Sequence, residues 1–205
     1  MDIKKINLDD LAKFISEIYM LKRNKREGFR LSGVDNPDSL TDHVAIAAQL
    51  AYIIGELEGL EGNKCAAIVL FHDNGEARIT DQHKVAARYI DNKEAEQQAI
   101  AEQLNLLPES IKNKIANLNK EFESRSTPEG IVAKDADWLE SALQAKIYSE
   151  QGYQNLENWI DNVSKALETQ TAKIILEEIK KTGNFTTKWW QGLKKMTYEK
   201  IYKKS

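Results

Sequence analysis

Apolar side chains recur at intervals of three and four residues along most of this chain, which is the spacing of one face of an α-helix. The pattern predicts helices over residues 11–21, 40–57, 63–73, 92–107, 108–122, 128–143, 156–181 and 188–203. Start signals precede several of them: Asn7 or Asp9 can cap the first, Ser39 follows a turn, and Pro128 stands in a first turn. We therefore expect an all-α fold.

The composition agrees with a helical protein that has one core. The chain of 205 residues holds only 10 glycines and 3 prolines, and 41% hydrophobic with 30% charged residues is typical of a soluble globular protein. This length is enough for one compact core. We expect a single domain over residues 1–205.

Charge, cysteine content and hydropathy limit the function classes. A net charge of −3 argues against a general nucleic-acid binder, and we interpret the lysine-rich carboxyl-terminal segment as amphipathic packing. The single cysteine, Cys65, excludes an internal disulfide, and its apolar neighbours favour a buried side chain over a nucleophile. With no apolar leader and no run of about 18 apolar residues, we expect a cytoplasmic protein with no membrane association.

The candidate metal ligands centre on an adjacent histidine–aspartate pair. His72 and Asp73 follow the apolar run 66–71, and they offer the imidazole nitrogen and carboxylate oxygen that a catalytic divalent metal accepts. A lone helical histidine such as His43 is more often structural, but the pair further along the chain makes it a candidate ligand. A fourth ligand would come from Asp137 or from Asp135, which point to different faces of one helix. His83, the third histidine, matches no ligand position, and we expect it at the surface.

The order His43, His72-Asp73, Asp137 resembles the H…HD…D signature of the HD-domain metal-dependent phosphohydrolases. The sequence of residues 25–43, 70–81 and 125–145 is similar to that of the 5'-deoxynucleotidase branch of that family. The resemblance implies an HD-domain helical bundle with a metal-site core over about 8–150 and C-terminal helices over about 155–203. It also implies one divalent ion (Mn, Co, Ni, Fe, Zn or Mg), which His43, His72, Asp73 and Asp137 would bind.

The same resemblance suggests roles for four further residues. Glu76 would act as general acid or base beside the metal, and Asp81 would meet the sugar and disfavour a 2'-hydroxyl. Arg26 would bind the phosphate with its forked guanidinium, and Phe29 would stack on a base or sugar. Two of these residues have a simpler interpretation, because Arg26 ends a basic cluster at a helix terminus and Asp81 can be a helix cap. Asn74-Gly75 is either a strained functional turn or a tight packing point.

The implied function is hydrolysis of deoxynucleoside 5'-monophosphates to nucleoside and phosphate. The implied partners are a small nucleotide and a second copy of the chain, since relatives form homodimers through their helices. One departure, Ser32 where relatives carry a basic residue, leaves the substrate contacts open. A second, Trp138, follows Asp137 where the family usually has a polar residue. The alternatives are another HD phosphohydrolase activity, on a triphosphate, cyclic nucleotide or alarmone, and a non-catalytic protein that retains the metal site.

Overall fold

The computed structural model describes residues 3–191 and 193, and within them the fold is entirely helical, as predicted. An isolated bridge between Lys25 and Ser39 is the extended pairing found in this part of the chain. The α-helices are α1 (Leu8–Ile18), α2 (Glu27–Leu31), α3 (Leu40–Leu57), α4 (Gly62–Leu70), α5 (Glu76–Ile79), α6 (Asn92–Leu104), α7 (Glu109–Ser124), α8 (Pro128–Glu150), α9 (Glu157–Ala166) and α10 (Gln170–Lys181). Among the helices described, none is both long and apolar enough to cross a membrane.

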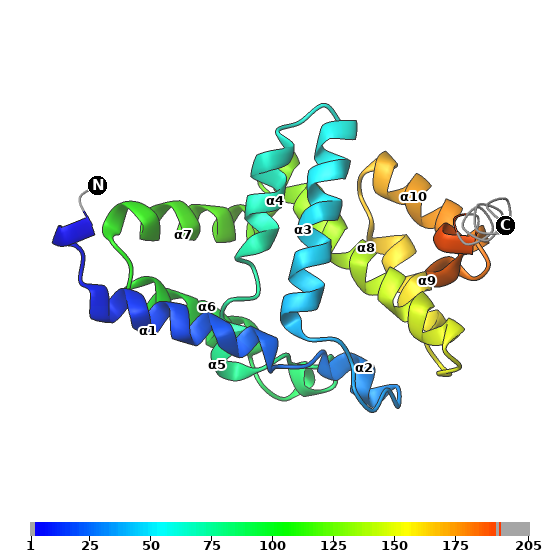
Figure 1. Ribbon diagram of the computed structural model, residues 1–205, viewed down its shortest axis with the longest axis horizontal. Helices are drawn as coiled ribbons and strands as arrows, with labels where there is room; N and C mark the ends of the chain where they lie inside the picture. The colour runs from blue at the N-terminus through cyan, green and yellow to red at the C-terminus, as the bar shows by residue number, and fades with distance from the viewer. Residues whose placement is uncertain (1–2, 192, 194–205) are drawn as a thin grey trace, which may run out of the picture.

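Helices α3, α4 and α8 pack on one another at the centre of the molecule (Figure 1). Alanines at their contacts, such as Ala51 and Ala136, are fully buried and let the helix axes approach closely. Gly55 serves the same purpose, since a Cβ there would lie 2.7 Å from the sulfur of Cys65. In Figure 1, α1, α6 and α7 extend to one side of this centre, and α9 and α10 cover α8 on the other.

Local capping chemistry sets the helix starts that position the site. Asn7, one of the two expected caps, accepts hydrogen bonds from the first backbone N–H groups of α1. Ser39 and Asp42 form a reciprocal capping box at the start of α3, whose bounds are those predicted from the sequence. Thr127 caps α8, with Pro128 in its first turn. Cys65 is fully buried as predicted, and burial raises the pKa of its thiol to about 11.

Several predicted helix boundaries are wrong. Helix α1 begins at Leu8 and ends at Ile18 rather than spanning 11–21, and α8 continues to Glu150, beyond the predicted end at 143. The helix expected over 63–73 ends at Leu70, so His72 and Asp73 lie on the turns that follow it rather than on the helix. The stretch 156–181 is two helices, because the chain leaves helical geometry at Leu167 and Thr169 then caps α10. The helix expected over 188–203 lies largely outside the described residues.

Candidate metal centre

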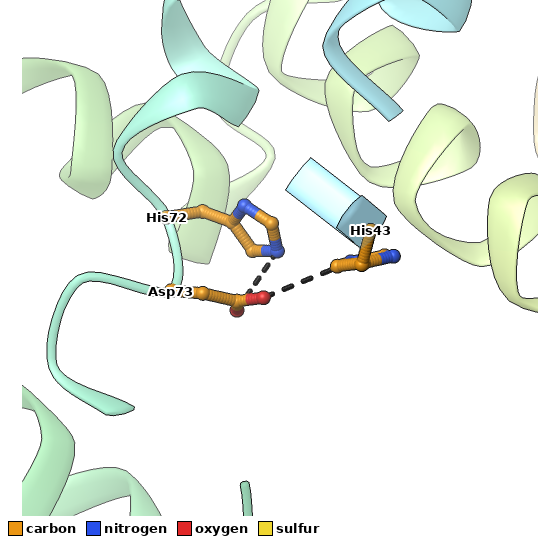
Figure 2. A group of neighbouring side chains, drawn as sticks. All are labelled: His43, His72 and Asp73. Carbon is orange, nitrogen blue, oxygen red and sulfur yellow. Dashed lines mark ion pairs between the residues drawn. The ribbon is translucent and has the colours of Figure 1, made fainter. Parts of the chain in front are cut away.

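The four expected ligands come from three separate segments and meet at one point. His43 lies in the first turn of α3, His72 and Asp73 follow α4, and Asp137 lies in α8. Nε2 of His43 is 3.1 Å from Oδ1 of Asp137, and Nε2 of His72 is 2.8 Å from Oδ1 of Asp73. Across the group, Nε2 of His43 is 3.7 Å from Oδ2 of Asp73, and Nε2 of His72 is 3.6 Å from Oδ1 of Asp137. Figure 2 shows the two imidazoles pointing toward the Asp73 carboxylate.

Both imidazoles are oriented through their other ring nitrogen. Nδ1 of His43 contacts the carboxylate of Glu140, and Nδ1 of His72 lies 2.6 Å from the carbonyl oxygen of Val69. A carbonyl oxygen only accepts, so Nδ1 of His72 carries a proton, and Nε2 is the ring atom that could bind a metal at the centre. Metal-binding histidines usually donate from the second nitrogen in this way.

The electrostatics of the group suit a cation. Burial opposes a charged imidazole, but Asp73 and Asp137 outweigh that effect and raise the pKa of His72 well above its usual value. Burial likewise opposes ionisation of Asp137, yet Lys134 and the two histidines hold its pKa well below the usual range. Ligand atoms of His43, His72 and Asp73 all lie within 4.8 Å of one another. Two imidazole nitrogens beside ionised carboxylates are a donor set that fits a first-row divalent metal.

Asp135, the alternative fourth ligand, faces away from this group. Its carboxylate accepts hydrogen bonds from the backbone N–H groups of Glu168 and Thr169 and from the Thr169 hydroxyl, at distances of 2.7 to 3.1 Å. Asp135 therefore fastens the segment between α9 and α10 to α8, while Asp137 faces both histidines.

Glu76 begins α5 and lies beside Asp73. Its Oε2 is buried without a hydrogen-bond partner, and burial together with Asp73, Asp81 and Glu96 raises its pKa well above the usual value. Glu96 of α6 completes a second acidic group with Asp73 and Glu76, in which burial and Asp73 raise the pKa of Glu96 to about 7. A Cβ on Gly75 would lie 2.9 Å from the Glu96 carbonyl oxygen, so the Asn74-Gly75 dipeptide is a tight packing point.

Arg26 and Asp81 lie on the α2 side of the centre. The Arg26 guanidinium donates to Oγ of Ser141 at 2.8 Å and pairs with Glu140 at 3.4 Å. Burial opposes its charge, but Glu140, Asp38, Asp73 and Asp81 together raise the pKa of Arg26. Oδ2 of Asp81 lies 3.5 Å from the backbone nitrogen of Gly28 at the start of α2.

The structure does not bring Phe29 into the site opening. Its side chain is 1% exposed, stacked on Trp159 with ring centroids 4.7 Å apart and edge-on to Tyr148. In this conformation the ring packs in a small core that joins α2 to α8 and α9. The physical reason is that two other aromatic side chains already occupy the space around it.

Three residues that lie beside the metal centre were not identified from the sequence. Lys134 pairs with Oδ2 of Asp137 at 2.9 Å, and Glu140 contacts His43. These two stand three positions before and after Asp137, on the same helix face, and that spacing was the available signal. Glu96, the third, is a long-range neighbour that no local pattern indicates. His83 is half-buried away from the centre, where its Nδ1 accepts from the Ala86 N–H.

Similarity to known proteins points to one family. The sequence pattern of the HD domain matches residues 18–180. The chain is 33% identical to 5'-deoxynucleotidase HDDC2 of Dictyostelium discoideum, over 75% of this chain and 84% of that protein. It is 30% identical to 5'-deoxynucleotidase HDDC2 of Homo sapiens, over 68% of this chain and 69% of that protein.

Solved structures show the same fold. A conserved hypothetical protein from Pyrococcus furiosus superimposes with a TM-score of 0.70 at 30% identity, covering 83% of this chain and 99% of that one. A predicted metal-dependent phosphohydrolase from Magnetospirillum magnetotacticum superimposes with a TM-score of 0.68 at 19% identity, covering 87% of this chain and 93% of that one. The chain therefore belongs to the HD-domain family of metal-dependent phosphohydrolases.

Proposed function

We propose that this phosphohydrolase is a 5'-deoxynucleotidase, which hydrolyses deoxynucleoside 5'-monophosphates to nucleoside and phosphate. The observation that carries the proposal is the convergence of His43, His72, Asp73 and Asp137, with the unpartnered Oε2 of Glu76 beside them. The names of the relatives, 5'-deoxynucleotidases in both human and Dictyostelium, support the substrate class.

His43, His72, Asp73 and Asp137 would hold the divalent ion. When bound, such an ion withdraws charge from phosphate oxygens and lowers the pKa of its water, which a phosphate monoester needs because its uncatalysed hydrolysis is extremely slow. Glu140 and the Val69 carbonyl keep the two imidazoles turned toward the centre.

Two cations of the chain would bind the phosphate. Arg26 is anchored through Ser141 and Glu140, and these contacts leave further N–H donors of its five for a phosphate oxygen. Lys134 lies on the opposite flank, against the Asp137 carboxylate. A phosphate monoester carries about two negative charges near neutral pH, so these two cations would add to the attraction of the bound metal ion.

Glu76 would move the proton of the reaction at Oε2, exchanging it with the attacking water or the leaving 5'-oxygen. Burial and the neighbouring carboxylates raise the pKa of Glu76, so its carboxyl keeps a proton to a higher pH than an ordinary glutamate does. Asp81, beside the start of α2, would contact the sugar and disfavour a 2'-hydroxyl. Deoxynucleotides would then be better substrates than ribonucleotides.

A homodimer is part of this proposal. The exposed face of α3 carries large apolar side chains, Ile46, Ile53 and Leu57, at helical spacing. A surface of this kind suits a symmetric helix-to-helix contact with a second copy.

The test combines metal analysis with a substrate panel. The protein, stripped and reloaded with Mn, Co, Ni, Fe, Zn or Mg, should release phosphate from deoxynucleoside 5'-monophosphates and less from ribonucleotides. Phosphate release only from triphosphates or cyclic esters would refute the proposal.

The role of Glu76 is tested by a substitution. The Glu76→Gln variant should keep the metal, and its kcat should fall at least about a hundredfold. Unchanged kcat would remove Glu76 from the mechanism.

A further inference from the structure

A cavity of about 420 Å³ lies between α6 and α7 and reaches the candidate metal centre. His72 lines it, and Glu96 belongs both to its wall and to the acidic group with Asp73 and Glu76. Cavities that bind small molecules commonly measure about 300–1,000 Å³. A molecule held by its phosphate at the centre therefore has room to extend between the two helices.

The walls of this cavity suit a planar, mostly apolar group. Ile100, Leu104 and Phe122 line it, and the centroid of the Phe122 ring lies 4.5 Å from that of the His72 ring. The charged residues Lys93 and Glu123 form an ion pair of 2.9 Å between exposed side chains of the two helices. The cations that line the cavity, Lys93 and Lys120, are both exposed, so its inner part is not built for a second phosphate.

Asn119 supplies the specific polar feature. It lines the cavity, and both its amide nitrogen and its amide oxygen are buried without a hydrogen-bond partner. Each such orphaned group costs about 1–3 kcal/mol in the free protein. A side-chain amide offers a donor beside an acceptor, which is the pattern that asparagine uses on the edge of a nucleobase.

We propose that this cavity is the base-binding subsite of the enzyme, and that Asn119 hydrogen-bonds the edge of the nucleobase while Phe122 contacts its face. The inference rests on the proposed function. Glu96 lines the cavity and also belongs to the acidic group with Asp73 and Glu76, so the sugar would lie beside Glu96, between the phosphate position and the cavity. Through this subsite the enzyme would bind a nucleotide more tightly than a sugar phosphate that has no base.

Two substitutions test the subsite without touching the metal centre. Asn119→Leu removes the amide, and Ala116→Leu places bulk in the cavity from an exposed backbone position. The matched controls are Asn117→Leu and Ala95→Leu, exposed positions on the same two helices that do not line the cavity. The measurement is KM for a deoxynucleoside 5'-monophosphate relative to KM for deoxyribose 5-phosphate, which has no base.

Asn119→Leu and Ala116→Leu should raise that KM ratio about tenfold, the equivalent of one well-made hydrogen bond, and the controls should leave it unchanged. Asn119→Leu should also raise the urea concentration at which half of the ligand-free protein is unfolded, because it removes a buried amide that has no hydrogen-bond partner. An unchanged ratio in both variants would overturn the subsite alone. Failure of the unsubstituted protein to hydrolyse deoxynucleotides would overturn the proposed function, and the subsite with it.

Discussion

Substitution of Asp135 should lower the stability of the fold, whereas substitution of Asp137 should lower metal affinity, although the two residues stand only two positions apart on α8. Asp135→Asn and Asp137→Asn are isosteric, so both keep the packing of the helix. Asp135 accepts bonds from two backbone N–H groups and one hydroxyl at Glu168 and Thr169, whereas Asp137 contacts His43, His72 and Lys134.

The cost of Asp135→Asn follows from its contacts. An asparagine keeps one acceptor oxygen and presents an NH₂ group where the other oxygen stood. The Glu168 N–H then loses one of its two acceptor oxygens, at 3.0 Å, and keeps the other at 3.1 Å. The bonds to the remaining oxygen fall from the strength of charged bonds, about 1.5–3 kcal/mol, toward that of neutral ones, about 0.5–1.5 kcal/mol. The free energy of unfolding should drop by about 3 kcal/mol, a large part of the usual 5–15 kcal/mol.

The assay pairs urea denaturation of the metal-free proteins with equilibrium metal binding. Asp135→Asn should bind the metal with the stoichiometry of the unsubstituted protein and unfold at lower urea. Asp137→Asn should lose metal affinity by more than the 10–100-fold typical of an indirect ligand partner. If the folded Asp135→Asn protein fails to bind metal while Asp137→Asn binds normally, the assignment of the two carboxylates is reversed.

Three further predictions follow from single contacts. Glu140→Gln should lower metal affinity about 10–100-fold, measured by competition with a chelator, because His43 loses the carboxylate that orients it; unchanged affinity would contradict this. Gly75→Ala should cost about 1–3 kcal/mol in urea unfolding, because the new Cβ meets the backbone of Glu96; a stable variant would show that α6 shifts freely. Cys65 should resist alkylation at pH 8 until the protein unfolds, since a pKa raised to about 11 leaves the buried thiol neutral there; rapid labelling of the folded protein would refute its burial.

Local sequence chemistry determined the helices and the identity of the donors. The start of α3 follows from Ser39 and Asp42, and the start of α8 from Thr127 and Pro128. Caps and helical periodicity act over three or four residues, so they can be identified without knowing the rest of the fold. The motif around His72 is also a short local sequence, so it could be identified from the sequence alone, although the helix before it ends at Leu70.

Only the tertiary structure decided which groups surround those donors. Glu96 reaches the centre because α6 packs against Gly75, and Phe29 is enclosed because Trp159 and Tyr148 close over it. Asp135 and Asp137 are alike in sequence, yet one fastens the segment between α9 and α10 and the other faces the histidines. These contacts join residues far apart in the chain, and their energies depend on burial and on neighbouring charges, which no short stretch of sequence encodes.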